Sequence, residues 1–373
     1  MTVSTARVVV VGAGILGAST AAHLARSGAS VDLVTEGDVA SGASGRSLSW
    51  LNSAGARSDA YHLLRTVAVD RWRTFAHRAD LQRAVRFDGG LTWAPAGQSY
   101  RERHAHELSI GYDSLWLGPD EVAAWTPGVD PAAIAAEGAV FNPGEGWVDL
   151  PLAVDELLAR LRAAGGRLHT GVGRAHPVVE NGRVTGVRTD SGATFTADAV
   201  VLATGPWVPR DLAELGVTVP EDTPVSLLLR TKPVDVALRA VLNTPRVAVR
   251  PAPSGTLVLD SGWSEQEVVV HGEGDYEVKE STLAGLLAEA SRVLAGNPSL
   301  ELAGHGVGPK PIPGDGEPVV GPVDGIAGLH VLFTHSGATL GLVLGEFTAR
   351  EVLTGTAHPL LASFRPARFT PGA

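Results

Sequence analysis

Three glycines near the N-terminus have the spacing of a dinucleotide-binding turn. Gly12, Gly14 and Gly17 form G-x-G-x-x-G directly after the apolar run 8–11. In such a turn the first glycine permits a tight bend and the second lets a pyrophosphate approach the backbone, while the third allows close helix–strand packing. The apolar run predicts a buried parallel strand, and the spacing that follows predicts a helix ending near Gly28. Free N–H groups and a partial positive charge at the helix N-terminus suit a phosphate.

An acidic residue follows at the distance that this motif requires. Glu36 ends the second predicted strand, which covers residues 31–34. A carboxylate at this point can accept hydrogen bonds from an adenosine ribose, and it would repel the 2′-phosphate of NADP. The alternative is a glycine-rich turn without a ligand, which would not need the acid. Strand, turn, helix, strand and acid together predict a dinucleotide site.

Length, charge and cysteine content limit the classes of protein and of site that the chain could represent. A chain of 373 residues with 44% hydrophobic residues is long enough for two domains. The net charge of -10 disfavours nucleic acid as a partner. The absence of cysteine excludes disulfides, thiolate catalysis, cysteine-ligated metals and attachment of a cofactor through cysteine. We expect no metal site. With no long apolar run and little chain before the first strand, we also expect no membrane span, no signal peptide and a cytoplasmic location.

A loop rich in Gly, Ser and Ala covers residues 37–53. Its hydroxyls, at Ser44, Ser47 and Ser49, could bond a phosphate or the cofactor; the alternative is an ordinary flexible loop. Residues 58–78 then have helical spacing. Tyr61 and His62 begin that helix, and we interpret them as helix surface or core rather than as catalytic groups.

The pattern changes in the next segment of the chain. Residues 86–96 predict a strand, a turn at Gly89-Gly90 and a second strand. Two short helices are expected over 100–110 and 120–125. Residues 141–150 are interpreted as a return to the first domain, followed by an amphipathic helix over 151–164.

Strand patterns dominate the second half. Residues 167–203 predict strands joined by tight turns at 181–182 and 190–192, ending in Thr204-Gly205-Pro206-Trp207. Residues 221–304 alternate apolar and polar positions, which predicts an antiparallel sheet with one wet face. A buried strand over 329–333, a turn, and a helix over 339–353 then repeat the strand–turn–helix arrangement.

Taken together, these stretches resemble the D-amino-acid oxidase superfamily, in its branch of glycine oxidase and sarcosine oxidase-like enzymes. The motifs that carry the resemblance are the N-terminal glycine motif, SGASGRS, VVLATGPW, PIPGDGEPVVGP, THSGATLG and LASFRPARF. The resemblance implies an α/β fold with a two-dinucleotide-binding, Rossmann-like FAD domain and an α+β substrate domain with an antiparallel sheet. The FAD-binding domain would comprise 1–85, 145–220 and 305–373, and the substrate-binding domain 86–144 and 221–304.

The resemblance also assigns cofactor contacts. Glu36 would bind the adenosine ribose, Arg174 would contact adenine through its backbone, and Gly205 would flank the cofactor. The pyrophosphate, the flavin edge and the flavin pyrimidine would be held by Gly12, Gly14, Ile15, Leu16, Gly17, Ala43, Ser44, Leu48, Ser49, Trp50, His335, Ser336, Gly337, Ala338, Thr339 and Leu340. We expect noncovalent FAD, because there is no cysteine and residues 37–52 contain no histidine.

The chemistry implied is removal of hydride from a carbon next to nitrogen, giving an imine. The substrate would be an amino acid or a secondary or N-methyl amine, and the electron acceptor would be O2 or an electron carrier. This reaction depends more on position and desolvation than on protein acids or bases. The alternatives are a flavin monooxygenase and a flavin-binding subunit without catalysis.

Substrate-binding residues are harder to assign. In the glycine oxidase pattern an arginine binds the substrate carboxylate, and this chain has Lys310 at that place. Lys310 could bind a carboxylate as a point charge, and the alternative is a solvated loop residue. Arg250, at the end of a predicted strand, is a second candidate. Val258 takes the place of the lysine that activates oxygen in sarcosine oxidases. Further candidates for the catalytic site or its lining are His335, Asn52, Trp50, His62 and Trp263.

Overall fold

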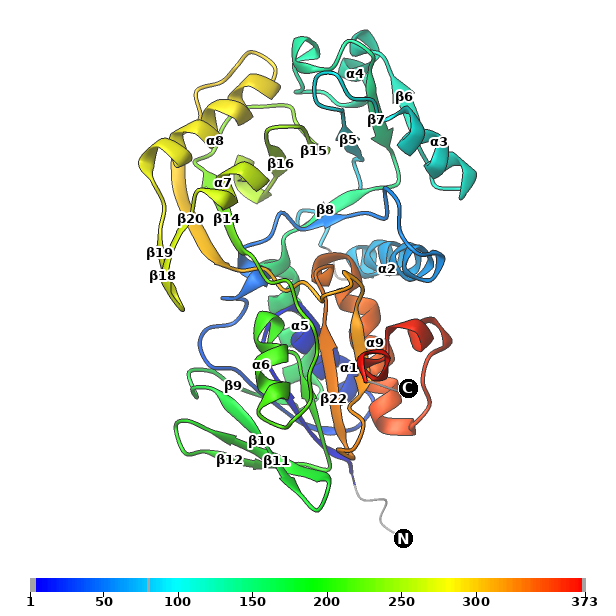
Figure 1. The fold of residues 1–373 in the computed structure, drawn as a ribbon, viewed down its shortest axis with the longest axis vertical. Helices are drawn as coiled ribbons and strands as arrows, with labels where there is room; N and C mark the ends of the chain where they lie inside the picture. The colour runs from blue at the N-terminus through cyan, green and yellow to red at the C-terminus, as the bar shows by residue number, and fades with distance from the viewer. Residues whose placement is uncertain (1–4, 79–80, 371–373) are drawn as a thin grey trace. The chain divides into compact units, whose positions relative to one another are not determined.

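The computed structural model describes residues 5–78 and 81–370, and it divides into two compact units (Figure 1). Unit 1 comprises Met1–Gly45, Leu150–Pro224 and Pro309–Ala373, and unit 2 comprises Arg46–Asp149 and Val225–Gly308. The first change of unit falls at residue 46, because the short strands β3 (Trp50–Leu51) and β4 (Val85–Arg86) both pair with β8 (Gly146–Val148). The bounds expected for the FAD-binding and substrate-binding domains stay a prediction.

Unit 1 is built on a six-stranded sheet with the order β21-β22-β13-β1-β2-β9. All neighbouring pairs are parallel except β21–β22. The apolar run at the N-terminus forms β1 at the centre, where both neighbours are parallel, and this explains its continuous hydrophobicity. The strands are β1 (Arg7–Val11), β2 (Ser30–Val34), β9 (Arg167–His169), β13 (Ala199–Leu202), β21 (Val319–Pro322) and β22 (Leu329–Phe333).

Two helices of unit 1 pack closely because glycines face the contact. In α9 (Gly337–Thr354), a Cβ at Gly341 would lie 2.5 Å from Ile15 Cγ1, and one at Gly345 would lie 2.2 Å from Ser19 Oγ. Both partners belong to α1 (Ile15–Arg26). The missing side chains therefore let the two glycine-rich motifs, far apart in sequence, come together.

The remaining elements of unit 1 are short. A meander of three antiparallel strands is joined at Asn181 and Gly182, whose φ of 50° and 74° confirm the predicted tight turn. The other elements are η1 (Ala43–Gly45), α5 (Leu150–Ala163), β10 (Ala175–Glu180), β11 (Arg183–Thr189), β12 (Thr194–Thr196), η3 (Gly205–Trp207), α6 (Val208–Ala213), η5 (Pro359–Phe364) and η6 (Pro366–Phe369).

Unit 2 is built on an eight-stranded sheet with the order β20-β14-β17-β16-β15-β5-β7-β6. From β14 to β6 the neighbouring pairs are antiparallel except for β15–β5, which is parallel. The strands are β5 (Gly90–Thr92), β6 (Leu115–Leu117), β7 (Ala139–Asn142), β14 (Val225–Thr231), β15 (Val241–Asn243), β16 (Ala248–Pro251), β17 (Leu257–Asp260) and β20 (Leu302–Pro309). One face carries the core, including Leu91, Phe141, Leu242, Val249 and Leu259, with α8 (Glu280–Val293) packed against it.

One expectation for unit 2 is confirmed and one is wrong. The expected strand, turn and strand are present as β4, Gly89 with a φ of 91°, and β5, and the two strands belong to different sheets. The second face of the large sheet is not wet at its centre, because Thr92, Asn142 and Arg250 are all buried there. The other elements of unit 2 are α2 (Asp59–Arg78), α3 (Arg101–Ser109), α4 (Pro119–Trp125), η2 (Pro131–Ala133), η4 (Pro253–Gly255), α7 (Gly262–Gln266), β18 (Val269–Gly272) and β19 (Asp275–Glu277).

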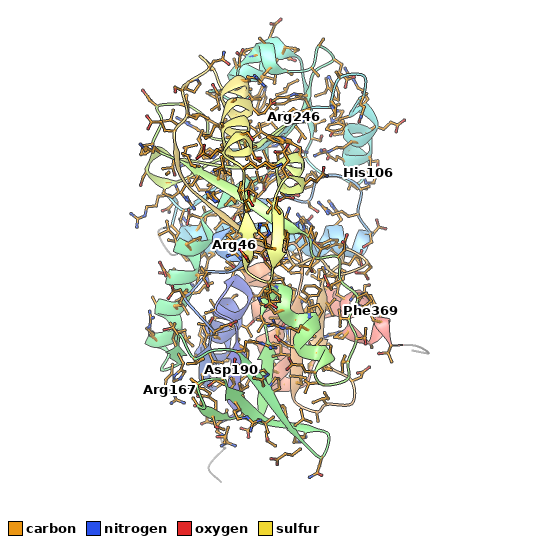
Figure 2. All side chains as sticks on the ribbon, turned by 60° about the vertical axis from the view of Figure 1, so that its left-hand side comes forward. Arg46, His106, Arg167, Asp190, Arg246 and Phe369 are labelled. Carbon is orange, nitrogen blue, oxygen red and sulfur yellow. The ribbon has the colours of Figure 1, made fainter. Side chains whose placement is uncertain are left out.

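The alternating glycines of β20 have a packing role. A Cβ at Gly306 would lie 2.9 Å from the Arg46 side chain, and one at Gly308 would lie 2.5 Å from Arg46 Nη2. The arginine stem therefore lies along a strand surface that has no side chains at these two positions, and Figure 2 labels its position. Among the helices of residues 5–78 and 81–370, none is long and apolar enough to cross a membrane.

Candidate active site

The glycine turn of unit 1 has the geometry that its sequence predicts. Gly12 has a φ of 103°, and a Cβ there would lie 2.4 Å from the Ala203 carbonyl oxygen. A Cβ at Gly17 would lie 1.8 Å from the Gly12 carbonyl oxygen. At Gly14, by contrast, the only atom within 4 Å of a Cβ is Ser44 Oγ, at 3.1 Å. The first and third glycines are thus required for packing, and the second leaves backbone open to a ligand.

The N-terminus of α1 presents donors to that open side. Ile15 donates its N–H to Ser44 Oγ at 3.0 Å, and the helix has no acidic residue in its first turn. The N–H groups of Leu16 and Gly17 belong to the first turn and have no intrahelical acceptor. With the positive end of the helix dipole, this arrangement fits a pyrophosphate. Ala43 and Ser44 lie in η1, which the Ser44 hydrogen bond holds against the helix.

Ser44→Ala is expected to weaken FAD binding by about 5- to 10-fold, because loss of one hydrogen bond costs about 1 kcal/mol and frees the η1 loop. Titration of the apoprotein with FAD, followed by flavin fluorescence, measures this change. Ser41→Ala is the control, since Ser41 is an exposed serine of the same loop. Equal affinities of the Ser44 variant and wild type would contradict the assignment.

Glu36 and Arg174 lie on exposed or half-exposed parts of unit 1. Glu36 is exposed just beyond β2, where its carboxylate is accessible to a ribose. The Arg174 backbone already bonds Asp190, through its N–H to Oδ2 at 3.2 Å and through its carbonyl to the Asp190 N–H at 2.9 Å. The adenine contact of Arg174 therefore stays a prediction.

The Arg174 side chain has a second role that the sequence did not indicate. Its guanidinium binds Asp211 at 3.2 Å and Glu214 at 2.7 Å. Asp211 also accepts a hydrogen bond from Thr204 Oγ1 at 2.6 Å. This chain of contacts fixes the turn before Gly205, whose φ of 62° and open Cβ position leave room beside the backbone.

The C-terminal motif forms a second helix N-terminus in unit 1. Ser336 precedes α9, makes no side-chain cap, and donates its N–H to Thr334 Oγ1 at 3.1 Å. No acidic residue lies in the first turn, so the positive end of the helix dipole is uncompensated there. The segment from His335 to Leu340, with Ser336, Gly337, Ala338 and Thr339 between them, is therefore suited to a group that gains negative charge.

The other predicted cofactor contacts, Leu48, Ser49 and Trp50, belong to unit 2. Ser49 has a φ of 57° and bonds Ser47 through both its N–H and its hydroxyl. Asn52 is also engaged, because Arg65 Nη2 donates to Asn52 Oδ1 at 2.9 Å. The structure thus gives Asn52 a structural contact, and its catalytic role stays a prediction.

His62 and Trp263 are also bonded within unit 2. His62 Nδ1 lies 2.9 Å from Ser53 Oγ, and Trp263 donates its Nε1–H to the Arg246 carbonyl at 2.8 Å. Both roles stay predictions.

Arg250 stands out among the candidate substrate residues. Its side chain is 2% exposed, and its guanidinium lies 5.2 Å from the centroid of the Trp147 ring. Its Nη1 donates to the Pro251 carbonyl at 3.0 Å, whereas its Nε is buried without a partner. Burial lowers the pKa of Arg250 to about 10, opposed by Asp149 and Asp260, neither of which forms an ion pair with it. Arg250 is therefore a buried cation that forms no ion pair with an acid in the described part of the chain.

Lys310 and Val258 have different surroundings. Lys310 lies in unit 1, is half-buried, has an interaction partner of its own, and donates its N–H to the Pro224 carbonyl at 2.8 Å. Val258 is fully buried in unit 2 in a small cluster with Leu228 and Ala252. Val258 pairs with both Arg250 and Arg230 across the sheet. An apolar side chain therefore lies between two arginines.

A buried carboxyl network in unit 2 was missed by the sequence analysis. Glu145 is fully buried, and Tyr112 donates its hydroxyl to Glu145 Oε1 at 2.6 Å. Glu107 is also fully buried and accepts hydrogen bonds from Arg103, Ser114, Asn142 and the Gly55 N–H. The signal in the sequence was one acid within the otherwise uncharged segment 139–148, but nothing local shows whether such an acid is buried.

Burial raises the pKa of Glu145 to about 7, although its hydrogen bond from Tyr112 opposes the shift. In the unfolded chain this carboxyl ionises near 4.5. Between these pH values the native state binds more protons than the unfolded state, so the free energy of unfolding falls as pH rises. The loss reaches about 3 kcal/mol above pH 7.

Glu145→Gln is therefore expected to make unfolding less sensitive to pH. The free energy of unfolding, measured by urea denaturation, should fall between pH 5 and pH 8 by about 3 kcal/mol more in wild type than in the variant. Glu301→Gln is the control, since Glu301 is an exposed acid paired with Lys232. The same pH dependence in wild type and in the Glu145 variant would show that Glu145 is ionised throughout.

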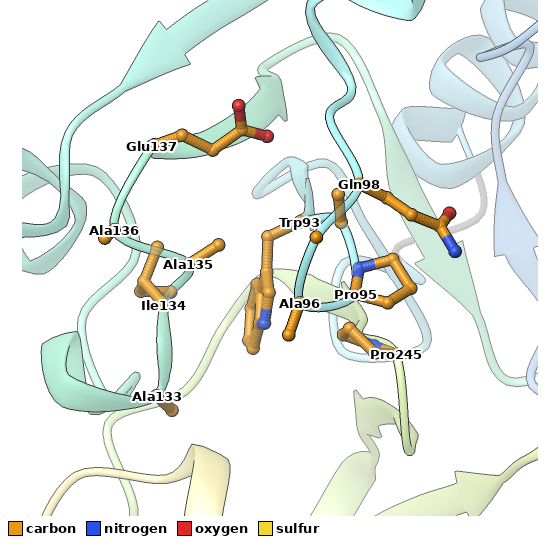
Figure 3. Close-up of a pocket in the computed structure, with 12 residues that line it drawn as sticks. Trp93, Pro95, Ala96, Gln98, Ala133, Ile134, Ala135, Ala136, Glu137 and Pro245 are labelled. Carbon is orange, nitrogen blue, oxygen red and sulfur yellow. The ribbon is translucent and has the colours of Figure 1, made fainter.

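A hollow of about 540 Å³ also lies in unit 2, away from these groups (Figure 3). Its lining is mostly apolar, with Gln98 and Glu137 as the polar side chains, and it contains no Lys or Arg. It therefore has no cation for a carboxylate. The lining residues include Trp93, Pro95, Ala96, Ile134, Ala135 and Pro245.

Comparisons with known proteins agree with this geometry. The family model described as FAD dependent oxidoreductase (DAO) matches residues 7–351. An uncharacterized oxidoreductase of Bacillus subtilis (strain 168), YurR, is 29% identical over 96% of this chain and 98% of its own. Glycine oxidase of Pseudomonas aeruginosa is 28% identical over 97% and 98%. The crystal structure of glycine oxidase from Geobacillus kaustophilus superposes with a TM-score of 0.85 at 21% identity, covering 98% of this chain and 99% of that one.

These matches confirm the resemblance drawn from the motifs, the two-part fold class, the enzyme class and FAD as the cofactor. The glycine turn, the α1 N-terminus and the α9 N-terminus are features of this structure that fit an FAD molecule. The chain belongs to the DAO family of FAD-dependent oxidoreductases.

Proposed function

We propose that the substrate is an amine whose oxidised carbon carries a carboxylate, and that Arg250 binds this carboxylate. The activity class, FAD-dependent oxidation of an amine C–N bond, follows from the family and from the glycine oxidase relatives. Neither a flavin monooxygenase nor a flavin-binding subunit without catalysis is favoured by any of these relatives or by the fold. The observation that carries the proposal is the buried Arg250 guanidinium, which forms no ion pair with any acid that the structure describes.

A buried cation without an anion is costly, because removing it from water is compensated only by an opposite charge and good hydrogen bonds. A substrate carboxylate would supply both, and the planar guanidinium can bind it through two parallel hydrogen bonds. Trp147 lies against the Arg250 guanidinium and restricts its orientation. Arg250 would therefore bind and orient the substrate and exclude water from the carboxylate.

The remaining chemistry needs few side chains. When bound, FAD accepts the hydride removed from the carbon next to nitrogen. The N-terminus of α9 would stabilise negative charge through its dipole. Unit 2 would supply position and a dry surrounding, which are the main requirements of this reaction. Lys310 is the weaker carboxylate candidate, because it is half-buried, has another interaction partner and binds carboxylate without a fixed fork.

Matched pairs of amines test the proposal. The holoenzyme is mixed anaerobically with glycine and methylamine, and with N-methylglycine and dimethylamine, while flavin absorbance is followed. We expect an acid to bleach the flavin and its carboxylate-free partner to leave it oxidised. Bleaching by both members of a pair, or by no acid although dithionite bleaches the flavin, would overturn the proposal.

Admission of air after bleaching identifies the electron acceptor. Rapid return of the yellow colour would indicate an oxidase, and slow return a dehydrogenase that uses an electron carrier. Val258, in place of a lysine, favours slow return. Beyond the substrate and the electron acceptor we expect no nucleic-acid partner, and a cytoplasmic location likewise stays a prediction.

A further inference from the structure

Unit 2 holds a second arginine that forms no ion pair with an acid of residues 5–78 or 81–370, and we propose that this residue, Arg57, binds a second carboxylate of the substrate. The preferred substrate would then be an iminodicarboxylate, in which the nitrogen lies between two carboxylate-bearing carbons. This inference rests on the proposed function, because it takes Arg250 as the site of the first carboxylate. The two arginines would select a dianion over a simple amino acid.

Arg57 lies in the segment just before α2, and its Nε is buried without a hydrogen-bond partner. Its guanidinium lies 5.6 Å from the centroid of the Tyr61 ring, and it forms no ion pair with a described acid. Burial and the nearby charge of Arg65 lower the pKa of Arg57 to about 10. It is still a cation at neutral pH. An anion bound beside it would relieve both the lost hydration and the repulsion from Arg65.

The fold holds this arginine in place through three hydrogen-bonded anchors. Ser53 donates its N–H to the Tyr112 hydroxyl at 2.9 Å, and Gly55 donates its N–H to Glu107 Oε1 at 3.0 Å. Arg65 bonds both oxygens of Asn52, at 2.8 and 2.9 Å. The segment before Arg57 is thus fixed on both sides by buried groups. An unpaired cation carried on such a rigid segment is a feature of binding sites rather than of mobile surface loops.

Two buried acids close to this segment, Glu107 and Glu145, do not form an ion pair with Arg57. Glu107 already accepts hydrogen bonds from Arg103, Ser114 and Asn142 as well as from Gly55. Glu145 is close enough to raise the pKa of Arg57, but burial favours its neutral form up to about pH 7. A neutral carboxyl beside Arg57 leaves the positive charge uncompensated and can donate its own proton to a bound carboxylate.

Arg250 and the Glu145 carboxyl, which is near enough to Arg57 to raise its pKa, adjoin one face of the large sheet. Arg250 is on the face opposite the core residue Val249, and continuing the β15–β16 register places Val241 next to it. Val241 pairs in turn with Gly90 of β5. The Glu145 carboxyl and the Trp50 ring pack directly on Gly90. A Cβ at this position would lie 2.4 Å from Glu145 Oε2 and 3.0 Å from Trp50 Nε1. Arg250 and Gly90, which the Glu145 carboxyl contacts, thus belong to a single row of residues, and their backbones are two strands or about 10 Å apart.

Tryptophans connect the two ends of this row. Trp50 and Trp147 face each other across β3 and β8, with Trp147 against Arg250 and Trp50 against Gly90. Thr92 Oγ1 and Asn142 Oδ1 share this face of the sheet, and both are buried without a hydrogen-bond partner. The row therefore has a cation near each end, aromatic surface between, and polar atoms with unused hydrogen-bonding capacity. A short dicarboxylate amine matches this arrangement of charge.

Binding of inert ligands tests the inference without turnover. Diglycolate has an ether oxygen in place of the amine of iminodiacetate, and methoxyacetate is its counterpart with one carboxylate. Each is titrated into the FAD-loaded protein while the flavin spectrum is followed. We expect wild type to bind diglycolate about 10- to 100-fold more tightly than methoxyacetate, the range of a charge-assisted hydrogen bond.

Arg57→Met and Arg57→Gln should each remove this preference while methoxyacetate affinity is unchanged, and Arg57→Lys should retain part of it. Arg101→Met is the matched control, since Arg101 also lies over an aromatic ring, that of Trp116 at 3.7 Å, but is exposed. Equal binding of both ligands by wild type, or equal weakening of both in the Arg57 variants, would overturn the inference.

Anaerobic reduction separates this inference from the proposed function. We expect iminodiacetate to reduce wild type with a second-order rate constant at least 10-fold above that of N-methylglycine, and Arg57→Met to abolish the difference. If N-methylglycine reduces the flavin as well as iminodiacetate does, the second anchor is wrong but the proposed function stands. If neither acid reduces it, the proposed function fails and the inference fails with it.

Discussion

Arg250→Met is expected to lower kcat/KM for the best carboxylate amine by about 100- to 1000-fold, with FAD still bound. The expected loss corresponds to about 3–4 kcal/mol, since a bidentate contact between charged groups in a buried site is removed. Methionine has a similar length and no charge. Because it also removes an uncompensated buried cation, the variant should be at least as stable as wild type.

Rates of anaerobic flavin reduction and the ratio of flavin to protein measure these effects. Arg246→Met is the matched control, because Arg246 also lies over a tryptophan, Trp263 at 4.8 Å, but is more than half exposed. Lys310→Met should reduce kcat/KM by less than 5-fold. A large loss in the Lys310 variant together with an unchanged Arg250 variant would reverse the assignment of the carboxylate anchor.

Gly17→Ala is expected to abolish stable FAD binding. A Cβ at this position would lie 1.8 Å from the Gly12 carbonyl oxygen, which is part of the backbone and cannot move without shifting β1 or α1. Overpacking of a close-packed interior usually costs 1–3 kcal/mol, and a clash of this kind exceeds that range. We expect at least about 3 kcal/mol of destabilisation and a colourless protein.

Gel filtration followed by flavin absorbance measures the bound FAD, and thermal unfolding measures the stability. Gly37→Ala is the control, because a Cβ at Gly37 has no atom within 4 Å. A yellow Gly17→Ala protein with the wild-type unfolding temperature would show that α1 is not packed on the glycine turn in this way.

The local parts of the fold are predictable from the sequence. The glycine turn, α1 and Glu36 follow one another within thirty residues of a strand, so the spacing alone specifies their arrangement. The tight turn at Asn181-Gly182 is predictable for the same reason, since both residues readily adopt positive φ. The resemblance to a known family then supplies the order of the chain segments.

Contacts between distant segments are not predictable in this way. β4 and β5 are separated by three residues, yet they belong to different sheets whose partners lie elsewhere in the chain. β15 has only three residues, too few for a period to be detected. Strand pairing of this kind depends on tertiary packing rather than on local preference.

The same limit applies to the candidate site. Arg250 could be named from its place at the end of a predicted strand, but its lack of an ion-pair partner is visible only in three dimensions. Arg57 and Glu145 were missed, because the contacts that surround them join distant parts of the chain. Tyr112, for example, bonds both Glu145 and Ser53, which are 33 and 59 residues away from it. Burial and pairing state, rather than residue type, distinguish these groups from ordinary surface charges.

A crystal structure of the FAD-loaded protein with methoxyacetate tests the central claim most directly. The account predicts the ligand carboxylate within 3.2 Å of the Arg250 guanidinium nitrogens, as in a charge-assisted hydrogen bond. A carboxylate bound instead to Lys310, with the Arg250 guanidinium still free of any anion, would contradict it.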